Sequence, residues 1–355
     1  MRAWLTPRLA ECETTGTSST IARGGDSSPV RRVAATCRPG SHDARGMLPP
    51  SPFTHTEARD GGLREREWRR LSAEGFVREV VPGYFVDSTL PDTLELRIAI
   101  ARRAIAPEAV VTRRTAAWLH GLDVLDHRGF PATPRIETVT RERGKRSDNR
   151  LMVAHVADDL LDSDIAEVDG LMVTTPLRTA CDLARFAPRT DALVAMDAYL
   201  RKGLVERDRL TNHLVRWKKR RGVRQAYATI EIADGRSQSG GESRMRLRVL
   251  DMGLPRPELQ IPVHDLFGNA RFWLDLGWPE WMLALEYDGE EFHPKERKAH
   301  DDARREWIAG RGWSVRAFRR EHVFTASRTF EDAVQMLVKD AAPRSSSIWR
   351  ALGGG

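Results

Sequence analysis

The last third of the chain carries the pattern that most constrains its fold. Residues 242–251 have the apolar spacing of a helix, whereas residues 258–264, 271–277 and 282–288 have the spacing of strands separated by short turns. A helix over 295–310, a strand over 313–318 and a mostly helical segment over 321–340 follow. The order helix, three strands, helix, strand, helix predicts an independent α+β domain, which we place at residues 237–342.

Three acidic residues fall inside the predicted strands of this domain. Asp275 lies in the middle of one strand, and Glu286 and Asp288 lie two residues apart on the next, so that both point to the same face. A hairpin would bring Asp275 beside Glu286. Clustered carboxylates repel one another and stay ionised only near cations, and their hard oxygen atoms suit Mg²⁺ or Mn²⁺. Such an ion can polarise a phosphodiester and activate water.

Two further residues are candidates for this site. His293 follows the strand end, and its ordinary pKa suits proton transfer near neutral pH. Glu242, on the preceding helix, is a candidate outer ligand or water-holding group. We therefore predict catalytic roles for Asp275, Glu286, Asp288, His293 and Glu242, with Asp275, Glu286 and Asp288 at the metal.

The segment FWLDLGWPEWMLALEYDGEEFH resembles the core of the restriction-endonuclease-like PD-(D/E)XK nucleases, and within them the Vsr-like branch and its relatives of unknown function. The segment DDARREWIAGRGWSVRAFRREHV is similar to the same branch. The resemblance implies an αβββαβ fold, a metal-dependent phosphodiesterase site with Asp275 and Glu286 as metal ligands, and a matching role for His293. Asp288 stands where many of these nucleases have a catalytic lysine.

The same residues have an alternative interpretation. A domain that has lost its activity would keep these acids as partners for Arg271 and Arg304. Four groups with this spacing in the expected elements favour the catalytic interpretation.

Residues 53–87 predict a compact unit near the N-terminus. A short helix over 54–59, a turn, a helix over 64–74 ended by Gly75, and a hairpin over 76–86 follow the order of a winged helix-turn-helix. The second helix would turn Trp68 and Leu71 inward. It would present four arginines to the major groove of DNA, namely Arg64, Arg66, Arg69 and Arg70. A solvated basic face is the alternative.

The middle of the chain, residues 91–236, predicts a mixed α/β region. Residues 91–120 and 177–232 have helical patterns, and residues 133–175 have strand patterns. The basic run 216–224 is a second candidate for contact with a phosphate backbone, although a solvated helix end explains it equally well. Its candidate DNA-binding residues are Lys218, Lys219, Arg220 and Arg221.

Three segments of the first two thirds, VVPGYFV, VVTRRTAAWLHGL and GLMVTTPLRTACDLA, resemble proteins with an AbiEi-antitoxin-type winged helix. Such proteins are often described as transcriptional regulators. These motifs are more structural than chemical in character. The resemblance implies a winged helix and a DNA partner for this part of the chain.

Charge and composition limit the possible partners and the cellular compartment of the protein. The formal net charge of +7 favours polyanionic partners, although arginine-rich composition weakens that argument. The three cysteines predict a reducing, cytoplasmic compartment, and no apolar run is long enough to span a membrane. The Ser-, Thr- and Gly-rich residues 1–46 predict a disordered leader, with Met47 as a hypothetical true start.

The full prediction is an α+β multidomain protein. It has a winged helix-turn-helix at residues 47–90, an α/β middle region at 91–236, a flexible joint at 237–241, the nuclease domain at 237–342 and a tail at 343–355. The first functional hypothesis is a Mg²⁺-dependent DNA endonuclease or nickase targeted by the winged helix. The alternatives are a non-catalytic DNA-binding regulator of the antitoxin type and, last, an RNA-directed nuclease. The sequence leaves a homo-oligomer open.

Overall fold

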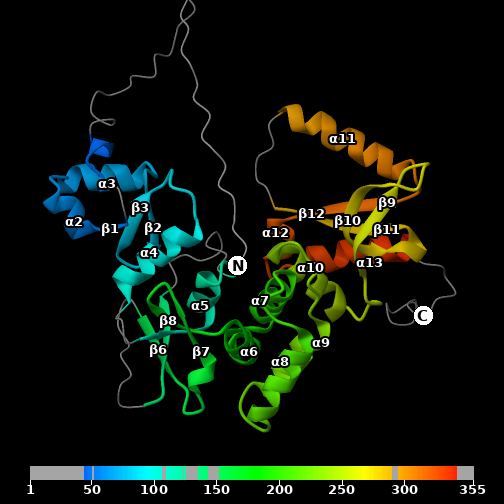
Figure 1. Cartoon of the computed structure of the whole chain (residues 1–355). Coiled ribbons are helices and arrows are strands. Elements are labelled where there is room, and N and C mark those ends of the chain that lie inside the picture. Colours follow the sequence, from blue (N-terminus) through cyan, green and yellow to red (C-terminus); the bar gives the residue numbers. More distant parts are fainter. Residues whose placement is uncertain are drawn as a thin grey trace, which may run out of the picture.

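The computed structural model describes residues 44–49, 52–105, 109–122, 124, 135–142, 152–289 and 295–341 (Figure 1). These residues form an α+β fold with three separate sheets, and α+β is the class that the sequence predicts. Among the described residues, no helix is both long and apolar enough to cross a membrane.

The N-terminal unit contains a three-stranded sheet and two helices. Its elements are β1 (Phe53–Thr54), α2 (His55–Asp60), α3 (Glu65–Ala73), β2 (Val77–Val81) and β3 (Tyr84–Asp87). The strand order is β1-β3-β2 with antiparallel pairing. Helix α2 begins with a capping box, in which Thr54 and Glu57 each bind the other's backbone N–H. The predicted order of helix, turn, helix and hairpin is confirmed.

The packing of this unit shows that it begins earlier than the predicted end of the leader at residue 46. Leu71 is buried and Trp68 is half-buried among aromatic residues, as predicted for the inward face of α3. However, Ala44 is also buried in this core, and Arg45 donates two hydrogen bonds to Asp87 at 2.8 and 3.0 Å. The prediction of a disordered leader up to residue 46 is therefore wrong for these two residues, because they complete the unit's packing.

The middle region contains a five-stranded mixed sheet. Its strand order is β6-β5-β4-β8-β7, and β5–β6 and β4–β8 are parallel pairs. The elements before the helical part are α4 (Leu94–Ala104), β4 (Val110–Val111), α5 (Arg113–Leu119), β5 (Ile136–Thr140), β6 (Met152–Val156), η3 (Asp162–Asp164), β7 (Ile165–Val168) and β8 (Leu171–Thr174). The uninterrupted helical interpretation of residues 91–120 is wrong, because the β-branched pair Val110–Val111 forms a strand.

Five further elements pack as a helical layer beside this sheet: α6 (Pro176–Phe186), α7 (Arg189–Arg201), α8 (Arg207–Leu214), η4 (Val215–Trp217) and α9 (Val223–Ile232). Their shared core includes Leu193, Tyr199, Leu210 and Trp217. The hairpin β2–β3 and helix α4 pack on the sheet through a different core, which contains Val86, Ile100 and Val173. The N-terminal unit is thus packed onto the middle region through its own hairpin.

The C-terminal domain has the predicted element order. It comprises α10 (Gly240–Asp251), β9 (Glu258–His264), β10 (Ala270–Trp278), η5 (Pro279–Trp281), β11 (Leu283–Asp288), α11 (Lys295–Ala309), β12 (Ser314–Arg319), α12 (Arg320–Val323) and α13 (Thr329–Ala341). The sheet order is β12-β11-β10-β9, with β11 and β12 parallel. Figure 1 shows α11 on one side of this sheet and α10 and α13 on the other.

The side chains of β11 alternate between these two layers. Leu283 and Leu285 pack with α10 and α13, whereas Ala284 packs with Ile308 of α11. Glu286 and Asp288 lie two and four residues after Ala284, so their side chains point to the same face of the strand. They therefore lie on the α11 side, as the strand period predicts.

The junction before this domain is packed. Ser237 is fully buried, and Gly240 begins α10 behind the capping residue Ser239. Arg246 of α10 donates to Asp197 of α7 at 2.6 Å, and both side chains are buried. The prediction of a flexible joint at residues 237–241 is wrong, because helix α10 is anchored in the core of the middle region.

Candidate functional site

Helix α3 presents part of the predicted basic face. Arg66 and Arg69 are exposed, and Arg69 donates to Glu65 one turn earlier at 2.9 Å. Arg64 is also exposed but is the N-cap residue rather than a helical one, and Arg70 is half-buried. Arg70 follows Arg66 by one turn on the same face of α3, but its side chain is less exposed than those of Arg66 and Arg69. The contact of these four arginines with DNA stays a prediction.

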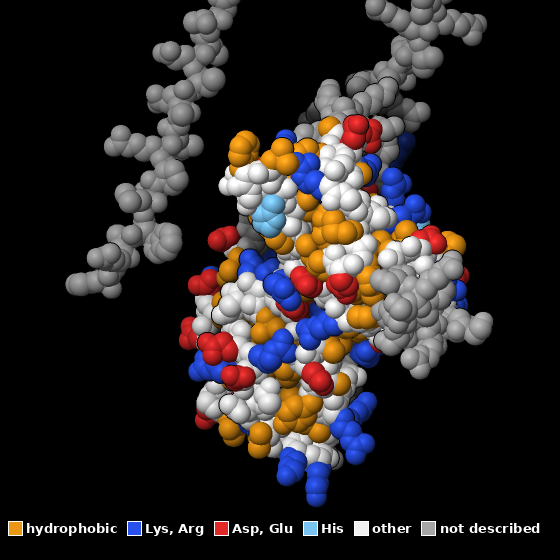
Figure 2. Space-filling model, turned by 90° about the vertical axis from the view of Figure 1, so that its right-hand side faces the viewer, with side chains coloured by type: hydrophobic (Ala, Val, Ile, Leu, Met, Phe, Trp, Pro, Cys, Tyr) orange, Lys and Arg blue, Asp and Glu red, His pale blue; other side chains and the backbone are white. Residues whose placement is uncertain are grey.

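The basic run after α8 is a turn rather than a helix end. Helix η4 ends at Trp217, and α9 begins at Val223 behind Gly222, whose φ is 81°. Arg220 donates to Asp158 at 2.8 Å, whereas Lys218, Lys219 and Arg221 are exposed. On the face shown in Figure 2, basic and acidic side chains are interspersed. The view thus gives no continuous basic track.

The predicted acidic residues of the C-terminal sheet do meet. Asp275, Glu286 and Asp288 line one pocket of about 250 Å³, together with Arg304 of α11. The pairing of β10 with β11 ends at Leu276 and Leu285, and Asp275 and Glu286 follow directly beyond it, lining the same pocket. The hairpin predicted from the sequence therefore brings these two carboxylates side by side.

Each acid has a different environment. Arg304 donates to both carboxylate oxygens of Glu286, at 2.5 and 2.9 Å. Asp275 accepts a hydrogen bond from the backbone of Tyr287 at 2.8 Å. Asp288 lies 3.9 Å from Arg319. The pairing of Glu286 with Arg304 is the contact that the alternative, non-catalytic interpretation expects.

Burial raises the pKa of Asp275 to about 7, and the nearby carboxylates of Glu242 and Glu286 act in the same direction. Glu242 is itself buried, which raises its pKa, and it accepts hydrogen bonds from Gln238 at 2.8 Å and Gln260 at 3.3 Å. The cluster thus includes Glu242, as predicted, although that residue does not line the pocket.

These residues do not fit a divalent cation in their present arrangement. No group of three or more His, Cys, Asp or Glu side chains within the described ranges is arranged to hold a metal ion. Glu286 would first have to leave Arg304. His293 lies outside the described residues.

The middle region contains a buried ion network that the sequence analysis missed. Arg178 donates to Asp182 at 2.8 Å, to Asp164 at 2.9 Å and to Asp159 at 3.3 Å, and lies over the ring of Trp217. The spacing Arg-x-x-x-Asp in TTPLRTACDLA was the available signal, since residues four apart meet on a helix. This network explains that motif as structural, as expected.

Comparison with known proteins agrees with part of the sequence interpretation. Residues 108–231 match the family model described as the AbiEi antitoxin C-terminal domain. Two proteins of Mycobacterium tuberculosis, uncharacterized protein Rv2248 and uncharacterized protein MT2308, are each 33% identical to this chain over 231 residues. The alignment covers 63% of this chain and 79% of each relative. The chain belongs to the family of these mycobacterial proteins.

The family match confirms the AbiEi-like resemblance for the middle region. It covers the five-stranded sheet from β4 onward and most of the helical layer. The match ends at residue 231, before α10 begins. The nuclease resemblance of the C-terminal domain therefore stays a prediction for this member of the family.

Proposed function

We propose that the protein is a DNA-binding regulator of the antitoxin type. The observation that carries the proposal is the match of residues 108–231 to an AbiEi antitoxin domain. The unit of β1, α2, α3, β2 and β3 precedes this domain and packs against it. Its element order is that of a winged helix, a common DNA-binding motif.

The surface of α3 supports the same proposal. Arg66 and Arg69 are exposed on one side of the helix, opposite the buried Leu71. Arginine at such positions can contact phosphates or the edges of guanine bases in the major groove. The winged helix would then read DNA, while the middle region and the C-terminal domain serve other contacts.

The test is binding of the purified protein to duplex DNA from the promoter of its own gene, measured by fluorescence anisotropy. We expect the double variant Arg66→Ala/Arg69→Ala to weaken binding about tenfold or more. The slope of log affinity against log salt concentration should fall by the amount expected for losing about one to two phosphate contacts. The matched control is Arg316→Ala/Arg328→Ala, which removes two exposed arginines from the C-terminal domain. Equal affinity of both double variants and the wild type would reject α3 as the DNA reader.

A second candidate function is a metal-dependent DNA endonuclease in the C-terminal domain. The raised pKa of Asp275 favours it, since crowded carboxylates are the arrangement that a cation stabilises. The bidentate contact between Arg304 and Glu286 argues against it, because both oxygens of that carboxylate are already bound.

This second candidate has its own test. Supercoiled plasmid is incubated with wild-type protein and Mg²⁺ or Mn²⁺, beside Asp275→Ala and an EDTA control. Nicking that is lost in both controls would support a nuclease. Intact plasmid with both metals would leave the regulator as the better account.

A further inference from the structure

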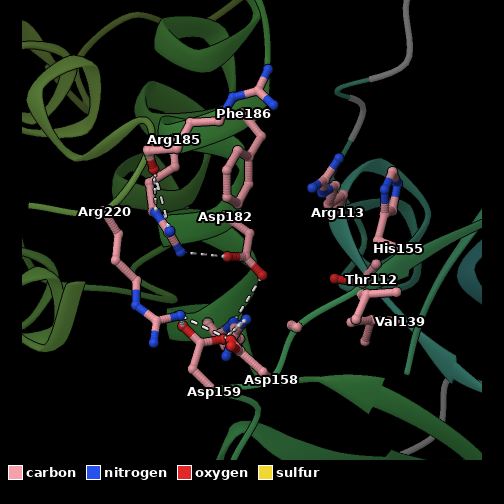
Figure 3. A pocket seen from close by; sticks show the side chains of 14 residues that line it. Thr112, Arg113, Val139, His155, Asp158, Asp159, Asp182, Arg185, Phe186 and Arg220 are labelled. Carbon is pink, nitrogen blue, oxygen red and sulfur yellow. Dashed lines mark hydrogen bonds and ion pairs between the residues drawn. The ribbon is translucent and has the colours of Figure 1, made fainter. Parts of the chain in front are cut away.

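A second pocket lies in the middle region, away from the acidic cluster of the C-terminal domain. It has a volume of about 390 Å³, within the range of sites that hold small ligands. Figure 3 shows two walls, with Asp182, Arg185, Phe186 and Arg220 on one side and Thr112, Arg113 and His155 on the other. The first wall comes mainly from α6, and the second from β4, β6 and the start of α5.

Arg113 is the unusual residue of the second wall. Its φ is 50°, a left-handed conformation that is strained for a residue with a side chain. Within the part of the chain that the structure describes, its guanidinium makes no hydrogen bond or ion pair. Its contact is with the ring of Phe186, at 4.6 Å from the centroid. Burial lowers the pKa of this guanidinium, so it is a partly desolvated cation that an anion would stabilise.

Asp182 is the unusual residue of the first wall. Its Oδ2 accepts from Arg178 at 2.8 Å, but its buried Oδ1 has no hydrogen-bond partner among the described residues. Nη1 of Arg185 lies 3.5 Å from Oδ1 and forms an ion pair with it. A buried carboxylate oxygen without a donor is costly, and a ligand that donates a hydrogen bond would satisfy it.

Three other arginines of the pocket differ from Arg113 because they are already engaged, whereas Arg221, which also lines it, is exposed to solvent. Arg178 is shared among three aspartates, Arg220 pairs with Asp158, and Arg185 donates to the backbone oxygen of Arg221. A purely structural role would leave Arg113 paired in the same way. The strain, the unpaired guanidinium and the unsatisfied Oδ1 instead all occur at one pocket.

We propose that this pocket binds a small oxyanion, whose phosphate or carboxylate group meets Arg113 and whose hydroxyl or amino group donates to Oδ1 of Asp182. The planar guanidinium of arginine matches either oxyanion through paired hydrogen bonds. This ligand-binding role is separate from DNA binding by α3 and from any chemistry of the acidic cluster.

Isothermal titration calorimetry on the full chain tests the proposal with three probes: adenosine 5′-monophosphate, malate and neutral adenosine. Both anions carry hydroxyl donors, so binding of one or the other distinguishes a phosphate ester from a carboxylate. The diagnostic variant is Arg113→Gly, because glycine adopts a φ of 50° without strain and the fold is kept. Its matched control is Lys219→Gly, which relieves the φ of 68° at an exposed turn residue that does not line the pocket.

We expect one of the anions to bind the wild type and Lys219→Gly equally, and to bind Arg113→Gly about tenfold or more weakly. Arg113→Lys, which keeps the charge but not the planar fork, should fall between them. The proposal is overturned if neither anion binds at millimolar concentration, if adenosine binds as well as its monophosphate, or if Arg113→Gly binds like the wild type.

Discussion

Arg304 holds both carboxylate oxygens of Glu286, so this acid of the C-terminal sheet is neutralised by a residue of the same domain. The neighbouring Asp275 has no such partner. Its pKa is raised to about 7, chiefly by burial and then by Glu242 and Glu286, while Arg304 opposes the shift. The four residues therefore form one electrostatic unit, in which a change at one position moves the titration of another.

Replacing Asp275 with asparagine should stabilise the protein at high pH. The folded-state pKa of about 7 lies above the ordinary value of about 4, so the folded state binds more protons between these values. The free energy of unfolding consequently falls as the pH rises from about 4 to 7. We expect Asp275→Asn to gain about 1–3 kcal/mol over the wild type at pH 8 and little at pH 4, measured by urea unfolding.

The control for that measurement is Asp265→Asn in the β9–β10 turn. Backbone hydrogen bonds from Asn269 and Phe267 lower the pKa of Asp265, which is the opposite direction. This variant should lose stability above the ordinary pKa rather than gain it. A gain of similar size in both variants would show that the effect is not the titration of Asp275.

Removing Arg304 should raise the pKa of Asp275 further. The guanidinium is a nearby positive charge that favours the ionised carboxylate, so its loss in Arg304→Ala leaves Glu242 and Glu286 unopposed. We expect the pKa of Asp275 to rise by about 0.5–1 in this variant. Carbon-detected NMR of the carboxyl group during a pH titration measures the change. Arg305→Ala, which removes a neighbouring exposed arginine of α11, is the control. An unchanged or lower pKa in Arg304→Ala would contradict the assigned geometry.

The buried ion pair between Arg246 and Asp197 should control the stability of the contact between α10 and α7. Arg246→Ala leaves Asp197 charged and buried, which costs about 3–5 kcal/mol. The partly exposed pair Arg244–Asp191 joins the same two helices, and Arg244→Ala should cost less than about 1 kcal/mol. Equilibrium unfolding in urea compares the two variants, and equal losses would mean that burial of the pair is unimportant.

Gly241 should tolerate no side chain. A Cβ atom at this position would lie 2.0 Å from the ring of Tyr287, the residue whose backbone binds Asp275. Gly241→Ala should therefore destabilise the protein by about 1–3 kcal/mol through overpacking. In Gly310→Ala, the nearest atom would lie at an ordinary 3.4 Å, so that variant is the matched control. Thermal unfolding that fails to separate the two variants would reject this close packing.

Much of the local structure could be predicted from the sequence. The strand patterns of residues 271–277 and 282–288 predicted the C-terminal hairpin, and the structure has it in the expected order, with Leu276, Leu283 and Leu285 in one core. The same periodicity predicted that Glu286 and Asp288 share a face. These features follow from residues close in the chain, whose geometry the backbone period fixes.

The sequence failed where partners come from far along the chain. The buried pair of Arg246 and Asp197, 49 residues apart, turned an expected flexible joint into a packed junction. Nothing in the sequence singled out Arg113. Only the fold placed it across a pocket from Asp182.

The sequence by itself determined the order of the elements, the helix–helix–hairpin unit, the AbiEi-like middle region and the meeting of Asp275 with Glu286. The tertiary structure decided which charges are neutralised. Arg304 reaches Glu286 from α11, whereas within the described residues the guanidinium of Arg113 lies over the ring of Phe186 and has no hydrogen-bond partner. The physical reason is that periodicity sets the direction of a side chain, whereas its electrostatic state depends on burial and on the charges that distant segments bring to it.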